Sequence, residues 1–371
     1  MTKTVLIIGG RGRIGTEVAR DIAAYCPDAE ITITGREENP DRRVSDEMGQ
    51  RVGYRALDLA DETGLREAIA DRDLVVHTAG PFHHRDGRVL QTCIELGVNY
   101  TDVSDNRGFT KRVLALKEAA QAAGVTAIVN TGIFPGISNS LVRQGVEQLD
   151  RADKIHLSYV VGGSGGAGVT VMRTTFLGLQ QPFEVWKDGK WQVVNPYSDR
   201  ETVEFPPPYG KIGVYWFDMP EAFTLPESFP VQTAMTKFGT APDFYNHLTW
   251  MVAHLWPSSW IKNPAVVEFL SQVSYFMTSI TDNFSGTGVA VRAAVSGMKE
   301  GKPATFCSST LHESAAVATG IGTGSIAEMM LDRKLDRPGV WPVEQALPTD
   351  LFKQIMASRN MKLYREFSID T

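Results

Sequence analysis

The first 130 residues alternate between two hydrophobic patterns. Short apolar runs, which are typical of buried strands, are followed by segments whose apolar residues recur every three to four positions, as in amphipathic helices. Val5 to Ile8 is the first run, and Ile14, Val18 and Ile22 recur at helical spacing behind it. Further apolar runs occur at residues 31–34, 52–57, 74–77, 98–103 and 125–129. Six strands separated by helices predict an α/β domain with a doubly wound parallel sheet, the Rossmann architecture.

From about residue 150 the pattern changes to strict alternation of apolar and polar positions. Residues 155–161 and 289–295 alternate in this way, which is typical of strands with one solvated face. Residues 187–190 and 299–302 contain turn signals between such strands and predict hairpins. We therefore expect residues 136–310 to form an α+β domain with a mixed, largely antiparallel sheet.

Helical spacing predicts helices at residues 87–96 and 110–123, each followed by a glycine that can end a helix. It returns at residues 315–331 and 351–357, and a proline-containing segment at 338–342 interrupts it. The predicted domains are a dinucleotide-binding Rossmann domain at residues 1–135, a substrate-binding and dimerisation domain at 136–310, and C-terminal helices at 311–371 that pack back on the Rossmann domain.

Composition and charge narrow the functional class. The 371-residue chain has a net charge of −6 and no basic bias, so we expect no nucleic-acid partner. Its three cysteines are scattered singly, which predicts neither disulfides nor a metal site and favours a reducing, cytoplasmic location. The N-terminal apolar run is too short for a signal peptide, and no apolar run approaches the ~18 residues of a spanning helix.

The most specific motif is Gly10-Arg11-Gly12-Arg13-Ile14-Gly15, which stands between the first strand and the first helix. In such a loop the glycines permit a tight turn, a close approach of the backbone to a pyrophosphate, and close packing of helix on strand. The helix N-terminus then faces the phosphates with free N–H groups. The predicted cofactor contacts are Gly10, Gly12, Arg13, Ile14 and Gly15.

The end of the second strand indicates which nicotinamide cofactor is bound. An NAD site usually carries an acid here, whereas this strand ends in Gly35 and Arg36. The small residue leaves room for a 2′-phosphate and the guanidinium matches it, so we predict NADP(H) in preference to NAD(H), with Arg36 as a ligand. The acids Glu37 and Glu38 keep NAD(H) open. Asp58 is predicted either to contact the adenine or to belong to a helix N-cap region.

Four segments resemble the saccharopine dehydrogenase-like oxidoreductases, which include saccharopine reductases and carboxynorspermidine dehydrogenases. They are the glycine loop, Ala79-Gly80-Pro81-Phe82, Tyr100-Thr101-Asp102 and residues 134–139, and the tail segment 339–344 is similar as well. The resemblance implies a Rossmann domain, a substrate and dimerisation domain, and NAD(P)-dependent hydride transfer. It also implies that residues 79–82 wall the nicotinamide, that Asp102 lies at the boundary of cofactor and substrate, and that Gly136, Ser138 and Asn139 face the substrate.

Proton transfer is the one chemical step left to the protein in such a reaction, because the cofactor carries the hydride. His83 follows the Gly80-Pro81-Phe82 turn and is the predicted catalytic acid or base. Tyr100 and Asp102 are alternative proton donors or substrate anchors. His77 ends a strand and is more typical of a buried core residue.

Three functions remain open from the sequence. The first is an NADP-dependent oxidoreductase that acts on a C=N bond or a secondary amine, as the resemblance suggests. The second is an enoyl-type reductase that acts on a hydrophobic C=C bond, and the third is a non-catalytic NADP sensor. Residues 244–280 are unusually aromatic. They favour a homodimer interface or core over a lipophilic substrate pocket or a peripheral membrane contact.

Overall fold

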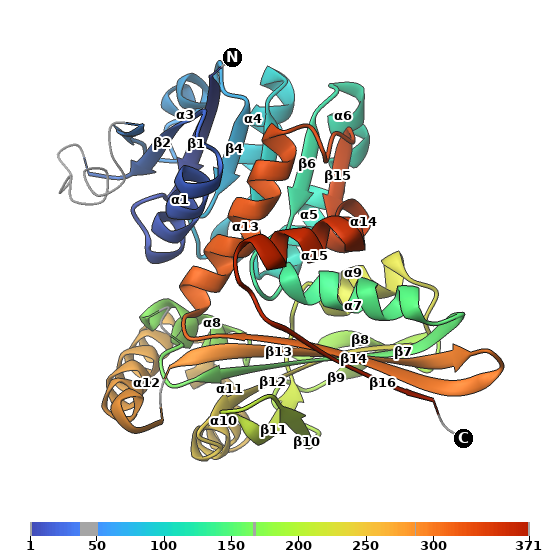
Figure 1. The fold of residues 1–371 in the computed structure, drawn as a ribbon. Helices are drawn as coiled ribbons and strands as arrows, with labels where there is room; N and C mark the ends of the chain where they lie inside the picture. Colours follow the sequence, from blue (N-terminus) through green and yellow to red (C-terminus); the bar gives the residue numbers. More distant parts are fainter. Residues whose placement is uncertain (1, 38–50, 166–167, 286, 370–371) are drawn as a thin grey trace. The chain divides into compact units, whose positions relative to one another are not determined.

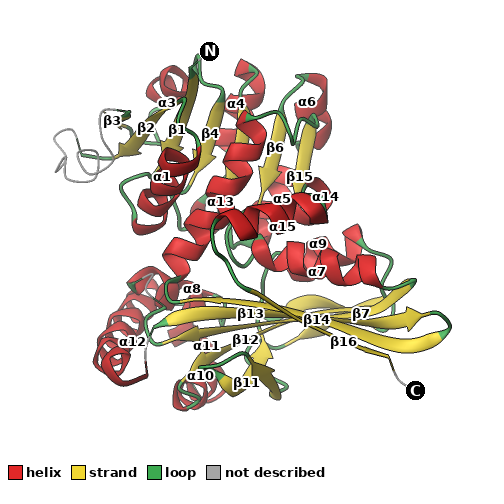
Figure 2. Cartoon of the chain, in the orientation of Figure 1, coloured by secondary structure: helices red, strands yellow, loops and turns green. Residues whose placement is uncertain are grey.

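The computed structural model describes residues 2–37, 51–165, 168–285 and 287–369 (Figures 1 and 2). The chain forms two compact units. Unit 1 comprises Met1–Ile137 and Ala316–Pro348, and unit 2 comprises Ser138–Ala315 and Thr349–Thr371. The tail thus contributes to both units. The functional domain limits drawn from the sequence stay a prediction.

Unit 1 contains a parallel sheet of seven strands in the order β15-β6-β5-β4-β1-β2-β3. Its strands are β1 (Lys3–Ile8), β2 (Ala29–Gly35), β3 (Val52–Ala56), β4 (Leu74–His77), β5 (Asn99–Asp102), β6 (Thr126–Val129) and β15 (Gly339–Pro342). Helices cover both faces of the sheet and bury the apolar residues of β1, β4, β5 and β6, whereas only Val52 is buried in β3. The predicted doubly wound fold is confirmed.

Helices connect the strands of unit 1 and cover its sheet. They are α1 (Arg13–Tyr25), α3 (Glu62–Ile69), the 3-10 turn η1 (Phe82–His84), α4 (Arg88–Leu96), α5 (Arg107–Leu114), α6 (Lys117–Ala122), α13 (Ala315–Leu331) and α14 (Val343–Ala346). Glycines let α13 pack closely against α1. A Cβ added to Gly320 would lie 2.7 Å from the Glu17 side chain, and one on Gly324 would lie 2.3 Å from Asp21 Oδ1.

Unit 2 contains a mixed sheet of nine strands, whose main path runs β10-β11-β12-β7-β13-β14-β16. Only the β7–β12 pair is parallel among these neighbours. The strands are β7 (Arg151–Gly162), β8 (Phe183–Lys187), β9 (Lys190–Val194), β10 (Glu201–Phe205), β11 (Gly210–Trp216), β12 (Thr233–Ala241), β13 (Gly288–Lys299), β14 (Lys302–His312) and β16 (Leu363–Ile369). Both predicted hairpins, β8–β9 and β13–β14, are confirmed.

Helices pack around this second sheet. They are α7 (Ile137–Gln148), α8 (Val169–Leu177), α9 (Glu221–Ser228), α10 (Phe244–Leu255), α11 (Ser258–Ile261), α12 (Pro264–Ser285) and α15 (Thr349–Ser358). Figure 2 shows α7 and α9 on one side of the sheet and α10 on the other. In the described part of the chain, no helix combines the length and the apolar character needed to cross a bilayer.

Three elements differ from the sequence expectations. The proline-containing segment at 338–342, expected only to break a helix, forms the edge strand β15, where the lack of an N–H donor is tolerated. In the tail, which was expected to be helical, residues 363–369 form β16 on β14. Arg365 and Glu366 occupy both faces of this strand and both are exposed, so no apolar period marks it. The helix expected at 110–123 divides into α5 and α6 where Leu116 N–H donates to Val113 O.

Candidate functional site

The glycine loop between β1 and α1 is a cradle without room for side chains. A Cβ on Gly15 would lie 2.4 Å from the Gly9 carbonyl oxygen, and one on Gly10 would lie 2.6 Å from Ile33 Cβ. Gly12 is the extended N-cap of α1, and no acidic residue follows in the first turn. The open cradle and the N–H groups of the first helical turn therefore fit the pyrophosphate of a dinucleotide.

The end of β2 holds an ion pair, Arg11–Glu37, and a second arginine, Arg36. A Cβ on Gly35 would lie 2.9 Å from Arg11 Cδ and 3.1 Å from the Tyr54 hydroxyl. Arg11 pairs with Glu37 at 2.7 Å, and this contact raises the pKa of Arg11 and lowers the pKa of Glu37. Glu37, one of the two acids that kept NAD open, is thus engaged, and Glu38 lies outside the described residues. Arg36 is exposed and has no ion pair within the described residues.

Arg85 is a second cation at this site, and no motif in the sequence marks it. Its Nε donates to the Ala79 carbonyl at 2.8 Å and its Nη2 to the Gly80 carbonyl at 3.4 Å. Burial and then the positive charge of Arg36 lower the pKa of Arg85. Among the described residues no carboxylate lies within ion-pair distance of Arg85. An anion bound near Arg36 and Arg85 would therefore relieve their repulsion.

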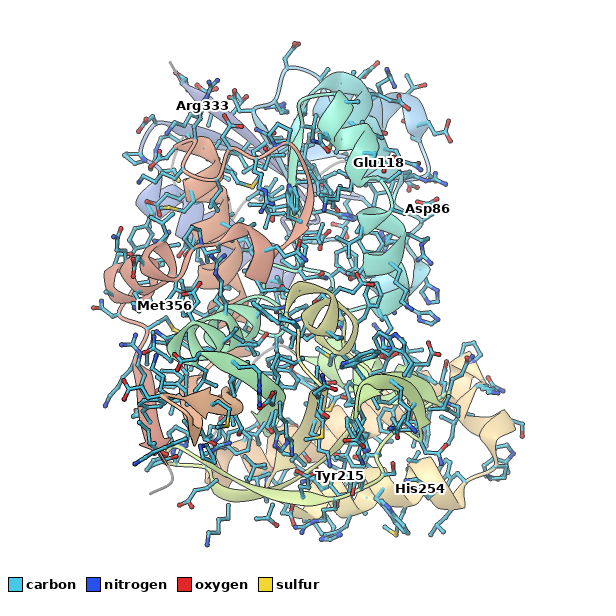
Figure 3. The ribbon with its side chains drawn as sticks, turned by 90° about the vertical axis from the view of Figure 1, so that its right-hand side faces the viewer. Asp86, Glu118, Tyr215, His254, Arg333 and Met356 are labelled. Atoms are coloured by element: carbon cyan, nitrogen blue, oxygen red, sulfur yellow. The ribbon has the colours of Figure 1, made fainter. Side chains whose placement is uncertain are left out.

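A cavity of about 240 Å³ adjoins Arg85 in unit 1, and its lining includes Asp58 and Arg88. Arg88 is neutralised by Asp86 at 2.7 Å (Asp86 is labelled in Figure 3). Asp58 is not the N-cap of the following helix, because Asp61 accepts the capping bond from Gly64 N–H. Asp58 accepts from Ala60 N–H at 3.0 Å and is exposed beside the cavity. The predicted adenine contact of Asp58 stays a prediction.

The loop after β4 lies directly against the glycine loop. A Cβ on Gly9 would lie 2.8 Å from the Ala79 backbone. The four positions predicted to wall the nicotinamide differ in exposure: Gly80 is exposed, Ala79 and Pro81 are half-buried, and Phe82 is buried. The Phe82 ring packs against His77 and Phe109, with ring centroids 5.0 Å away in each case. Phe82 thus anchors the loop in the core of unit 1.

Tyr100 and Asp102 lie in a fully buried polar cluster with His77. The Tyr100 hydroxyl lies 3.1 Å from His77 Nδ1. Asp102 Oδ1 accepts from the N–H groups of Ser104 at 3.0 Å and Asn130 at 3.1 Å, which ties the ends of β5 and β6 together. The structure thus brings two of the three predicted catalytic residues together inside unit 1.

Burial dominates the electrostatics of this cluster. It lowers the pKa of His77 to about 3, so the imidazole is neutral at physiological pH. It raises the pKa of Asp102 to about 6, although the two backbone N–H groups oppose this shift. Burial also raises the pKa of Tyr100 above its ordinary value, with a further contribution from the Asp102 charge. The cluster holds one carboxyl that titrates near neutral pH.

His83 differs from these residues because it is exposed, in the turn η1. Partial burial lowers its pKa, and the neighbouring charges of His84 and Arg112 act in the same direction. An accessible imidazole with a lowered pKa is mostly neutral at pH 7 and can accept a proton.

The predicted substrate residues lie around the start of α7. Gly136 has φ +131°, and a Cβ there would lie 2.1 Å from the Gly132 carbonyl oxygen. Ser138 and Asn139 are buried in unit 2. Ser138 Oγ donates to Glu221 Oε1 at 2.9 Å, and the Tyr159 hydroxyl donates to the same oxygen at 2.8 Å. Glu221 and Tyr159 have no local sequence signal, because only the fold brings them to α7.

This fold and this loop define the class of protein: a dinucleotide-binding domain joined to a second α+β unit. The chain resembles the saccharopine dehydrogenases more specifically. Residues 5–128 match the family profile of the saccharopine dehydrogenase NADP binding domain. The predicted resemblance to the saccharopine dehydrogenase-like oxidoreductases is confirmed. The matched NADP binding domain profile also supports NADP(H), which the open glycine cradle and the cations near β2 fit.

Individual proteins show the same relationship. Carboxynorspermidine synthase of Vibrio cholerae is 23% identical over 317 residues, which cover 77% of this chain and 75% of the relative. The NADP(+), L-glutamate-forming saccharopine dehydrogenase of Saccharomyces cerevisiae is 25% identical over 53% of this chain and 44% of the relative. The apo structure of that yeast enzyme covers 99% of this chain with a TM-score of 0.70 at 14% identity, so the fold is shared.

Proposed function

We propose that the protein is an NADP(H)-dependent oxidoreductase that transfers a hydride to or from a C=N bond or secondary amine. The cofactor assignment rests on the end of β2, where Gly35 stands in place of an acid and the exposed Arg36 has no ion pair within the described residues. The similarity to a carboxynorspermidine synthase and to a saccharopine dehydrogenase supports the substrate class.

In this proposal the residues of unit 1 bind and orient the cofactor, which supplies the hydride chemistry when bound. The glycine loop, with Arg13 and Ile14, receives the pyrophosphate at the N-terminus of α1. Arg36 and Arg85 receive the 2′-phosphate, and Asp58 contacts the adenine. Ala79, Gly80 and Pro81 wall the nicotinamide.

His83 is the proposed proton donor or acceptor, because it is the exposed member of the predicted catalytic set. Tyr100 and Asp102 have no exposed surface, so we assign them positioning roles: Asp102 for the ends of β5 and β6, and Tyr100 for His77 at the end of β4. Phe82 likewise positions the loop that carries His83. Gly136, Ser138 and Asn139 are proposed to shape the substrate side, with Glu221 fixing Ser138.

An enoyl-type reductase remains the second candidate, because residues 244–280 carry so many apolar side chains. A non-catalytic NADP sensor is the third. For any of these functions we propose a cytoplasmic homodimer with a small-molecule ligand. A turnover screen separates the candidates by following NADPH oxidation with α-keto acid plus amine pairs and with enoyl thioesters. Turnover of the first set alone supports the proposal, and turnover of enoyl substrates alone contradicts it.

The cofactor assignment has a test that does not need turnover. Calorimetric titration should show that Arg36→Ala and Arg85→Ala each weaken NADPH binding about tenfold or more and leave NADH binding nearly unchanged, because each loses a charge-assisted bond to the 2′-phosphate. Arg88→Ala is the matched control, since Arg88 lines the same cavity but is neutralised by Asp86. An unchanged ratio of NADPH to NADH affinity in Arg36→Ala would refute the assignment.

A further inference from the structure

One edge of unit 2 exposes an unusual amount of apolar surface. Of the fifteen large hydrophobic side chains exposed in the described residues, ten lie between residues 244 and 280, on α10, α11, α12 and their connections. We call these exposed side chains the apolar face. Figures 1 and 3 show their helices at the outer edge of unit 2, with His254 labelled near one end of α10. Ten such side chains expose on the order of 1,000 Å², more than the ~300–600 Å² of the largest patch on a typical monomer.

Helix α12 shows that this exposure follows a pattern. Phe269, Val273, Phe276 and Ile280 are 64%, 37%, 66% and 51% exposed, and their spacing of four, three and four residues places them on one side of the helix. The other side is also apolar, with Leu270 buried. A helix on a solvated surface carries charged residues on its outward side. This outward side therefore fits an apolar environment better than water.

The polar side chains of the outward side make bonds within their own helix. Between Phe269 and Ile280 only Gln272 and Ser279 are exposed polar residues on α12. Gln272 Nε2 donates to Glu268 Oε1 at 2.8 Å, and Ser279 Oγ donates to the Phe276 carbonyl at 2.7 Å. A protein interface of standard size carries about ten hydrogen bonds across it. Hydroxyls that bond back to their own helix suit contact with lipid instead.

The charge of the region decides what kind of lipid it fits. From residue 244 to 280 the formal charges are Lys262 and Glu268 alone. Glu268 is neutralised by Arg173 of α8 at 2.7 Å. The exposed Trp250, Trp256 and Trp260 add the side chain that favours the boundary between hydrocarbon and water. Since the Glu268 charge is paired, Lys262 carries the remaining formal charge between residues 244 and 280, and a face with so little charge complements a zwitterionic lipid surface rather than an anionic membrane.

We propose that the apolar face docks the protein on a zwitterionic lipid surface, with α12 lying in the interface plane. Flotation with phosphatidylcholine vesicles tests this proposal. The wild-type protein should float with the vesicles, and Phe269→Ser/Phe276→Ser should weaken the partition by about tenfold or more because two exposed rings no longer enter the acyl boundary. Binding should not increase with anionic lipid and should persist at about 1 M salt, since no ion pairs are involved.

Matched variants and the oligomeric state complete the test. Val273→Ser should weaken flotation by about threefold, whereas Val193→Ser, at a 71% exposed position on β9, should leave it unchanged. Both variants and the double variant should retain NADPH binding, which depends on unit 1. A wild-type protein that does not float overturns the proposal. So does binding that requires anionic lipid, or a wild-type dimer that becomes monomeric in Phe269→Ser/Phe276→Ser without floating, which would assign the face to a second copy.

Discussion

The two units each bury one carboxyl group beside residues of the candidate site, and they hold it in different ways. In unit 1, Asp102 Oδ1 accepts from two backbone N–H groups, those of Ser104 and Asn130. In unit 2, Glu221 Oε1 accepts from two side-chain hydroxyls, those of Ser138 and Tyr159. The first arrangement depends mainly on the path of the main chain, and the second depends on the identity of particular side chains.

This difference determines how each cluster responds to substitution. Backbone N–H groups remain in place when a neighbouring side chain changes. We therefore expect substitutions around Asp102 to leave its hydrogen bonds nearly unchanged. The partners of Glu221 lie 83 and 62 residues away in sequence, and each bond is lost when a single side chain is altered. We therefore expect the larger mutational effects in unit 2.

The strongest test of this comparison is Glu221→Ala. Removing the carboxyl takes away the bond that each of two buried hydroxyls donates to it, and each such bond to a charged group contributes roughly 1.5–3 kcal/mol, so we expect unit 2 to lose about 4 kcal/mol. Urea unfolding followed by tryptophan fluorescence measures this loss, because six of the seven tryptophans lie in unit 2. Glu221→Gln keeps an acceptor oxygen and should restore most of the stability. Equal losses in both variants would contradict the role of the two hydroxyls.

The pH dependence of Asp102→Asn tests the unit 1 side of the comparison. The pKa of Asp102 is about 6 in the folded protein and 3.8 as its ordinary value, so this carboxyl makes the folded state less stable as pH rises from about 4 to 6. The pKa of His77 is lowered from 6.5 to about 3, so His77 makes the folded state less stable as pH falls through the same window. The two contributions oppose each other in the wild type.

In Asp102→Asn only the His77 contribution remains. The stability of the variant relative to the wild type should therefore rise by about 3 kcal/mol between pH 4 and pH 6, which corresponds to about two pKa units. Urea unfolding followed by circular dichroism at several pH values measures the free energy of unfolding of both proteins. The contributions of all other titrating groups cancel when the wild-type value is subtracted from that of the variant. A difference that stays constant with pH would show that Asp102 titrates normally in the folded state.

The sequence predicted the parts of the molecule whose signals are local. The six apolar runs and the glycine loop each carry their own physical reason within a few residues, and both hairpins were marked by their turns. Strands β15 and β16 were not predicted. Prolines in and before β15 are typical of a break, and the charged residues of β16 interrupt its apolar pattern.

The parts of the site that the sequence did not indicate depend on tertiary contacts. Arg85 belongs to the site because its guanidinium donates hydrogen bonds to the carbonyls of Ala79 and Gly80. No sequence motif predicts these bonds. Glu221 is one acid among many until the fold brings it to Ser138. The aromatic segment at 244–280 was visible in the sequence, but only the structure distinguishes exposed side chains from a core.

A matched pair of tyrosines gives the smallest and most direct test. Tyr100 and Tyr159 are both fully buried, and each places its hydroxyl in one of the two clusters. Tyr159→Phe removes a bond to a carboxylate oxygen and should cost about 2 kcal/mol, whereas Tyr100→Phe removes a bond to the neutral imidazole of His77 and should cost about 1 kcal/mol. Urea unfolding of the two variants measures both losses. The substitution and the burial are the same in both variants, so the two losses can be compared directly. A larger loss for Tyr100→Phe would mean that the Asp102 cluster of unit 1 depends on its tyrosine hydroxyl more than the Glu221 cluster of unit 2 does.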